Sequence, residues 1–79
     1  MAVSFTAQII HDKRPMLAVI VPQLRKNGMH YEVNIKGFPR FYMVWSALGR
    51  YDVAGGEDAP VLPYGLILAV SDAIEASSQ

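Results

Sequence analysis

Residues 18–35 have the sequence AVIVPQLRKNGMHYEVNI, in which Asn27-Gly28 separates two apolar-rich runs. Asn-Gly is the strongest short-range signal for a β-hairpin, because a type I′ turn needs a positive φ at both central residues. With Asn27-Gly28 as the loop, the cross-strand pairs are Lys26–Met29, Leu24–Tyr31, Pro22–Val33 and Ile20–Ile35. These pairs are largely apolar and the interleaved pairs are mostly polar, which predicts an antiparallel hairpin with one buried face.

Three further turns keep the apolar residues on this face. The expected loops are Asp12-Lys13, Gly37-Phe38-Pro39 and Ala47-Leu48-Gly49. They give the pairs Phe5–Ile20, Ala7–Ala18, Ile9–Met16, Ile35–Phe41, Val33–Met43, Tyr31–Trp45, Trp45–Tyr51 and Met43–Val53. A one-residue error in any turn would move its strand's apolar side chains to the other face. The agreement therefore predicts an antiparallel meander of four to five strands over residues 1–54.

Pro22 is the feature that opposes a continuous second strand. Proline cannot donate to a ladder, so it needs a bulge or an unpaired position. Leu17, Ile20, Val21 and Leu24 also have the spacing of a helical stripe. A short helix over residues 22–27, ended by Gly28, is the alternative for this stretch.

The C-terminal third predicts one helix. Residues 55–62 have the composition of a loop, and Pro63 suits the first position of a helix over residues 63–76, with 77–79 as a tail. Its apolar stripe contains Leu66, Ala69, Val70, Ala73 and Ile74, with Leu62 just before it, whereas Ser71, Asp72 and Glu75 fall on the other side. So short a helix is unstable alone in water, so we expect it to pack on the apolar sheet face. The predicted fold is a single α+β domain over residues 1–79.

The composition excludes several classes of protein. The chain has 79 residues and no cysteine, with 52% hydrophobic and 18% charged residues. Disorder, a disulfide framework and cysteine metal sites are therefore excluded. The longest uncharged run, residues 59–71, is shorter than the ~20 apolar residues of a membrane span. No apolar signal segment follows the first basic residue, Lys13, so we expect a cytoplasmic protein without a membrane partner.

The charges are divided unevenly along the chain. Residues 1–50 hold seven basic and two acidic residues, a net charge of +5, whereas residues 51–79 hold five acidic and no basic residues, a net charge of −5. This division is typical either of an internally complementary domain or of a domain with an anion-binding face.

Apolar residues on the outer sheet face favour protein association. A core of this size supplies only about 3–5 kcal/mol without a further stabilising element, and contiguous exposed apolar patches usually mark interfaces. The interface candidates are Ile10, Leu17, Val19, Val21 and Val44. We expect a non-enzymatic protein-interaction domain that self-associates through this face or through an edge strand.

A basic and aromatic sheet face is the alternative site, for nucleic acid or another anion. Its candidates are Arg25, Lys36, Phe38, Arg40, Tyr42 and Arg50, with Phe38 as an exposed stacking ring. Cations that neutralise phosphates beside stacking rings are typical of nucleic-acid sheets. The sequence pI of about 6.7 lies below the range above about 9 that favours nucleic acid.

No residue pattern supports catalysis, a metal or a cofactor. The expected register places Ser46 opposite His30 with Glu32 nearby, but no nucleophile elbow surrounds the serine. His11 and His30 fall on opposite faces, and no third ligand accompanies either. Trp45 and Met43 have the parity of the inner face, so both are predicted to lie in the core.

Overall fold

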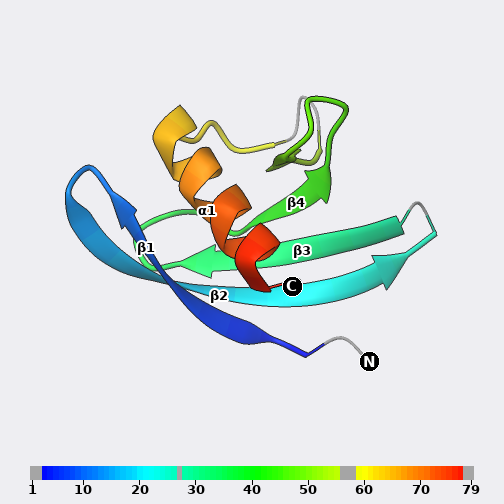
Figure 1. Cartoon of the computed structure of the whole chain (residues 1–79), viewed down its shortest axis with the longest axis horizontal. Coiled ribbons are helices and arrows are strands. Elements are labelled where there is room, and N and C mark those ends of the chain that lie inside the picture. Colours follow the sequence, from blue (N-terminus) through cyan, green and yellow to red (C-terminus); the bar gives the residue numbers. More distant parts are fainter. Residues whose placement is uncertain (1–2, 27, 56–58, 78–79) are drawn as a thin grey trace.

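The chain forms one antiparallel sheet and one helix (Figure 1). A computed structural model describes residues 3–26, 28–55 and 59–77. The elements are β1 (Phe5–His11), β2 (Arg14–Arg25), β3 (Gly28–Ile35), β4 (Phe41–Trp45), β5 (Tyr51–Val53) and α1 (Tyr64–Ser77). The strands lie side by side in chain order, and the sheet curls into a half-barrel. The expected α+β fold, a meander followed by a packed C-terminal helix, is confirmed.

The core lies between α1 and the inner face of the sheet. Residues that alternate along β1 to β4 point to this face, and α1 covers it with contacts to β1 and β5. The buried apolar residues are Ile9, Ala18, Ile20, Val33, Ile35, Phe41, Met43, Leu66, Val70 and Ile74. Met43 is fully buried, as the sequence predicts.

Two of the four expected registers are confirmed. β1 pairs with β2 through Phe5–Ile20, and β4 pairs with β5 through Trp45–Tyr51. The first turn is tight, because Asp12 and Lys13 both adopt positive φ values of 54° and 62°.

The registers on either side of β3 are displaced by two residues from the prediction. Ile20 pairs with Val33 instead of Ile35, and Arg25 pairs with Gly28, so the chain reverses one residue earlier than expected. Gly28 therefore ends the turn with φ +114°; Asn27, the other residue of the predicted loop, lies outside the described residues.

The β3–β4 connection is longer than predicted. Phe41 pairs with Val33 instead of Ile35, because the chain first turns at Phe38, whose N–H donates to the Ile35 carbonyl at 3.1 Å. Side chains alternate with a period of two along a strand, so displacements of two residues leave every side chain on its predicted face.

Residues 22–25 continue β2, and the short helix is not formed. Pro22 pairs with Tyr31 of β3. The β1 ladder ends at Ile20, so beyond that point β2 has β3 as its single neighbour in the described sheet. An edge position of this kind tolerates the missing N–H of proline.

The helix begins one residue later than predicted. The Pro63 carbonyl accepts from the N–H groups of Leu66 and Ile67 at 3.1 and 3.2 Å, so Pro63 precedes the first helical residue, Tyr64. Ser71, expected on the polar side, is buried instead, because its Oγ accepts a hydrogen bond from the backbone N–H of Tyr51 at 3.0 Å.

The prediction of a buried Trp45 is wrong. Trp45 lies on the inner face, as its pairing with Tyr51 requires, but 58% of it is exposed. The physical reason is that the sheet extends beyond the area that α1 covers: Trp45 is the last residue of β4, and α1 packs on β1 and β5. The β2–β3 hairpin also projects past the C-terminal end of α1 (Figure 1). Leu24 and Met29 on this hairpin are exposed for the same reason.

Parts of the expected loop and tail, residues 56–58 and 78–79, lie outside the described residues. Within the described segments, α1 lacks the length and apolar character that a membrane-crossing helix needs.

Candidate functional site

The outer face carries an exposed apolar strip beside the edge strand β1. Ile10, Leu17 and Val19 are 70%, 63% and 43% exposed. Ile10 pairs with the exposed Pro15 across the β1–β2 hairpin, and Leu17 and Val19 follow along β2. We call Ile10, Pro15, Leu17 and Val19 the outer strip.

Val21 and Val44, the other two interface candidates, do not belong to this strip. Both are half-buried. Val21 pairs with Glu32 and Val44 pairs with Asp52, so each has an acidic residue as a cross-strand neighbour. The apolar surface is therefore smaller than predicted and confined to β1 and the first half of β2.

The centre of the outer face is a hydrogen-bonded network around Glu32. Its carboxylate accepts from Asn34 Nδ2 at 3.0 Å, from Gln23 Nε2 at 3.3 Å and from the Tyr42 hydroxyl at 3.5 Å. Arg40 Nη1 lies 4.0 Å away. The side chain of Glu32 is 18% exposed, so these contacts compensate a largely buried negative charge. The network places an acid in the middle of the predicted basic face.

Three of the six anion-site candidates, Arg25, Tyr42 and Arg40, surround this network. The Arg25 guanidinium carbon lies 4.8 Å from the Tyr42 ring centroid, and its Nη2 donates to Gln23 Oε1 at 2.7 Å. Arg25, Tyr42 and His30 line a hollow of about 190 Å³, together with Ala54 and Gly55. Lys36 is exposed at the end of β3, in the β3–β4 connection.

The other two candidates face different surroundings. Phe38 was expected to be an exposed ring, but it packs against the core, edge-on to His11 with 6.5 Å between ring centroids. Arg50 Nη2 lies 3.5 Å from Asp52 Oδ2, and its guanidinium carbon lies 5.1 Å from the Tyr64 ring centroid. Sequence reasoning missed His11 and Tyr64 as partners because they come from β1 and α1, whose positions against these residues depend on the tertiary fold.

The side chains that suggested a catalytic triad are not brought together. In the displaced register His30 pairs with Gln23, and its Nδ1 lies 3.3 Å from the Gly28 carbonyl oxygen. The Ser46 hydroxyl donates to the Arg50 carbonyl at 2.9 Å and accepts from the Leu48 N–H at 3.2 Å. It therefore stabilises the β4–β5 turn. In the described part of the chain, no three His, Cys, Asp or Glu side chains form a metal-binding group.

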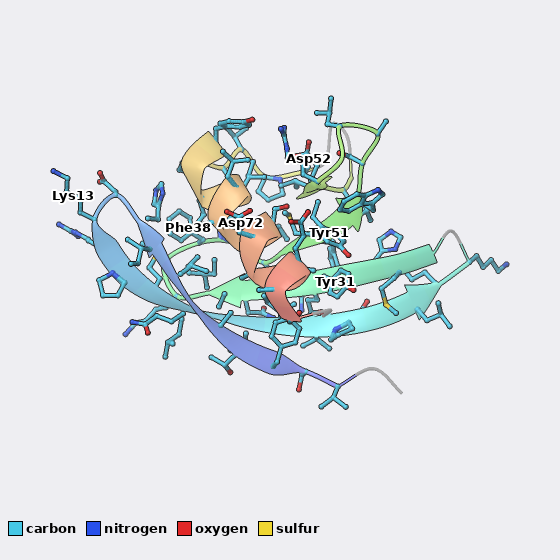
Figure 2. The ribbon with its side chains drawn as sticks, viewed as in Figure 1. Lys13, Tyr31, Phe38, Tyr51, Asp52 and Asp72 are labelled. Carbon is cyan, nitrogen blue, oxygen red and sulfur yellow. The ribbon has the colours of Figure 1, made fainter. Side chains whose placement is uncertain are left out.

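The inner face holds a second surface, which the sequence did not reveal. Tyr31 and Tyr51 meet edge-on with 5.2 Å between ring centroids, and Tyr51 meets Trp45 in the same way at 5.1 Å. Figure 2 shows Tyr31 and Tyr51 together near the C-terminal end of α1, with Phe38 on the other side of the helix. Burial, a hydrogen bond with Tyr31 and the nearby charge of Glu75 raise the pKa of Tyr51 to about 12.

We found no match to the chain among protein families, curated proteins or solved structures.

Proposed function

We propose that the protein is a small non-enzymatic interaction domain that self-associates through the outer strip. The observation that carries the proposal is the exposure of Ile10, Leu17 and Val19 on adjacent strands, where nothing in the described chain covers them. Large apolar side chains clustered in this way on a sheet's solvent side mark an interface.

A second copy is the partner that best suits the position of the strip. It lies beside β1, a seven-residue edge strand that pairs with β2 alone in the described sheet. An unpaired edge of this length is a template for another strand. Two copies related by a two-fold axis can cover both β1 edges and both strips in one isologous contact.

The shape of the strip also supports self-association. Next to the exposed Leu17 lies a hollow of about 380 Å³, lined by Pro15, Met16, Leu17, Ile35 and Lys36. Ile10 protrudes from the neighbouring strand. Ile10 lies on the β1 side of β2 and the hollow opens on its β3 side, so Leu17 lies between a protruding apolar side chain and a recess, an arrangement that two copies related by a two-fold axis can share.

Charge substitutions in the strip test the proposal. We expect Leu17→Glu and Val19→Glu each to lower the apparent mass from dimer to monomer, because a buried carboxylate without a partner is strongly unfavourable. Val61→Glu is the matched control, since Val61 is fully exposed and lies outside the sheet. Light scattering after size exclusion gives the mass, and circular dichroism confirms that each variant is folded. If both variants are folded and keep the mass of the wild type, the outer strip is not the interface between copies.

A second candidate function is binding of nucleic acid or another anion at the Arg25 hollow. The observation that favours it is the meeting of Arg25, His30 and Tyr42 around one recess, since a cation beside an aromatic ring suits a phosphate and a base. Glu32, bonded to Tyr42, opposes it. Anisotropy of a labelled oligonucleotide tests it at low salt: we expect Arg25→Ala with Arg40→Ala to weaken binding and to reduce its salt dependence. No binding by the wild type would reject this function.

A further inference from the structure

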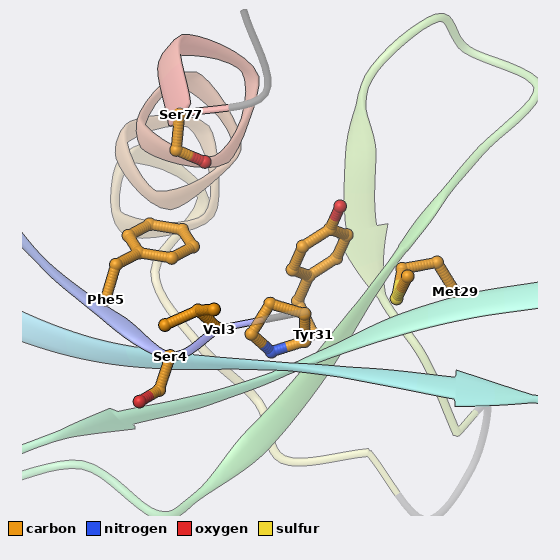
Figure 3. Close-up of a pocket in the computed structure, with 7 residues that line it drawn as sticks. Val3, Ser4, Phe5, Met29, Tyr31 and Ser77 are labelled. Carbon is orange, nitrogen blue, oxygen red and sulfur yellow. The ribbon is translucent and has the colours of Figure 1, made fainter. Parts of the chain in front are cut away.

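A hollow opens on the inner face where α1 ends. Its volume is about 420 Å³, and its lining is Val3, Ser4, Phe5, Pro22, Met29, Tyr31 and Ser77. Figure 3 shows the Phe5 ring below the last helical turn, with Tyr31 and Met29 opposite and the Ser4 hydroxyl directed away. We call this hollow, with the adjoining rings of Tyr51 and Trp45, the inner groove. The hollow is as large as the smaller ligand pockets of proteins, which begin at about 300 Å³.

The rim of the groove is apolar and accessible. Trp45 and Met29 are 58% and 38% exposed. The register that pairs Tyr31 with Met43 brings Trp45 level with Met29, so the two side chains flank the same part of the inner face. Aromatic rings and methionine are the side chains that dominate protein-binding surfaces.

The electrostatics of the groove favour a positive charge. None of the residues that line the hollow is charged. Ser77, the last residue of α1, forms part of the lining, and the last turn of α1 has no basic residue to offset the partial negative charge of a helix C-terminus. Glu75, in the same last turn, adds a carboxylate whose charge acts on the Tyr51 hydroxyl. The exposed face of Trp45 also attracts cations.

We propose that the inner groove binds a peptide segment of a partner protein in which an apolar or aromatic side chain lies next to lysine or arginine. The apolar side chain fills the hollow between Phe5, Met29 and Tyr31. The cation lies between the C-terminal end of α1 and the ring of Trp45. This site is separate from the outer strip, which lies on the opposite face of the sheet.

The same observations argue against other occupants. A phosphate or a fatty-acid carboxylate would meet the helix C-terminus and Glu75 without a cation in the lining of the hollow. A purely apolar segment would gain nothing from the partial negative charge at the end of α1. The experiment therefore compares two peptides of opposite charge, with an oligonucleotide as a further anionic probe.

Trp45 is the single tryptophan, so its fluorescence reports binding in the groove. The probes are a short peptide that alternates leucine and phenylalanine with lysine, the same peptide with glutamate for lysine, and a single-stranded oligonucleotide. We expect the lysine peptide to shift the Trp45 emission in a saturable way and the other two to leave it unchanged. Equal binding of the glutamate peptide, a shift with the oligonucleotide, or no shift with the lysine peptide at millimolar concentration would overturn the proposal.

Methyl spectra of the methionines locate the site without any substitution. Met29 lies in the groove, whereas Met43 is fully buried and Met16 lies elsewhere on the sheet. We expect the lysine peptide to move the Met29 methyl signal and to leave those of Met43 and Met16 in place. A shift of Met16 instead of Met29 would contradict the assignment to the inner groove.

A charge variant supplies the matched comparison. Met29→Lys places a competing cation in the groove, and we expect it to lower the affinity for the lysine peptide by about tenfold or more. Val61→Lys adds the same charge outside the sheet and should leave the affinity unchanged. Equal affinities for the two folded variants would also count against the proposal.

Discussion

The indole of Trp45 meets the ring of Tyr51 edge-on, with 5.1 Å between ring centroids and an interplanar angle of 77°. This packing holds the indole in place while more than half of the residue remains exposed. The contact therefore gives the inner groove an ordered aromatic rim, which sequence parity alone assigned to the core.

The exposure of Trp45 predicts how strongly acrylamide quenches its fluorescence. We expect acrylamide to quench its emission in the folded protein nearly as strongly as in urea, because the outer-strip contact leaves the inner face open. A comparison of the two quenching constants measures this. Strong protection in the folded state would show that a second copy covers the inner face instead.

The raised pKa of Tyr51 predicts that the folded protein loses stability at high pH. Its pKa rises from 10.0 to about 12 through burial, the hydrogen bond with Tyr31 and the charge of Glu75. The folded state therefore keeps a proton that the unfolded state releases, so the stabilisation is complete below about pH 10 and is lost between about pH 10 and 12. Tyrosinate absorbance should contain a late titration step that belongs to Tyr51. In Tyr51→Phe this late step should disappear, and its persistence would contradict the assignment.

The buried hydroxyl of Ser71 stabilises the fold, so we expect its removal to lower the free energy of unfolding. Its Oγ is the acceptor for the Tyr51 N–H, so Ser71→Ala leaves that donor without its partner. We expect the free energy of unfolding in urea to fall by about 1–3 kcal/mol. Ser77→Ala is the control, because Ser77 is exposed and donates to the Ile74 carbonyl at the helix end. Equal losses for the two variants would show that the Ser71 contact is not special.

We expect alanine substitutions at two glycines to change the stability of the protein in opposite directions. Gly28 has φ +114°, so Gly28→Ala should destabilise the protein by about 1–2 kcal/mol. Gly65 lies in the first turn of α1, where an added Cβ would meet His11 Nδ1 at 3.7 Å, an ordinary contact. Gly65→Ala should therefore stabilise the protein by up to about 1 kcal/mol. Thermal unfolding of both variants checks the signs, and a stabilising Gly28→Ala would refute the turn geometry.

The sequence was most informative about which face each strand residue occupies. Face assignment depends on parity, and parity survived a two-residue displacement of β3, so Val33 and Phe41 are buried although their predicted partners were wrong. Register itself depends on where each turn closes. Between Arg25 and Gly28, and in the connection where Phe38 turns the chain, the local sequence allows more than one turn position, and the packing of the whole sheet selects one of them.

The candidate sites were less predictable, because exposure depends on what covers a face. The outer strip followed from parity at Ile10, Leu17 and Val19. The inner groove did not, since it exists because α1 ends at Ser77 while the β2–β3 hairpin continues beyond it. Likewise, the helix supplied Ser71 and Tyr64 as partners for β5 and Arg50, contacts without any local sequence signal.

The mass of the wild-type protein in solution, measured by light scattering across concentration at low and high salt, tests self-association most directly. The outer strip predicts a species of about twice 8.7 kDa that persists in high salt, because apolar contacts are not screened by ions. A monomer at every concentration would contradict self-association, and a dimer that dissociates in high salt would contradict an apolar interface.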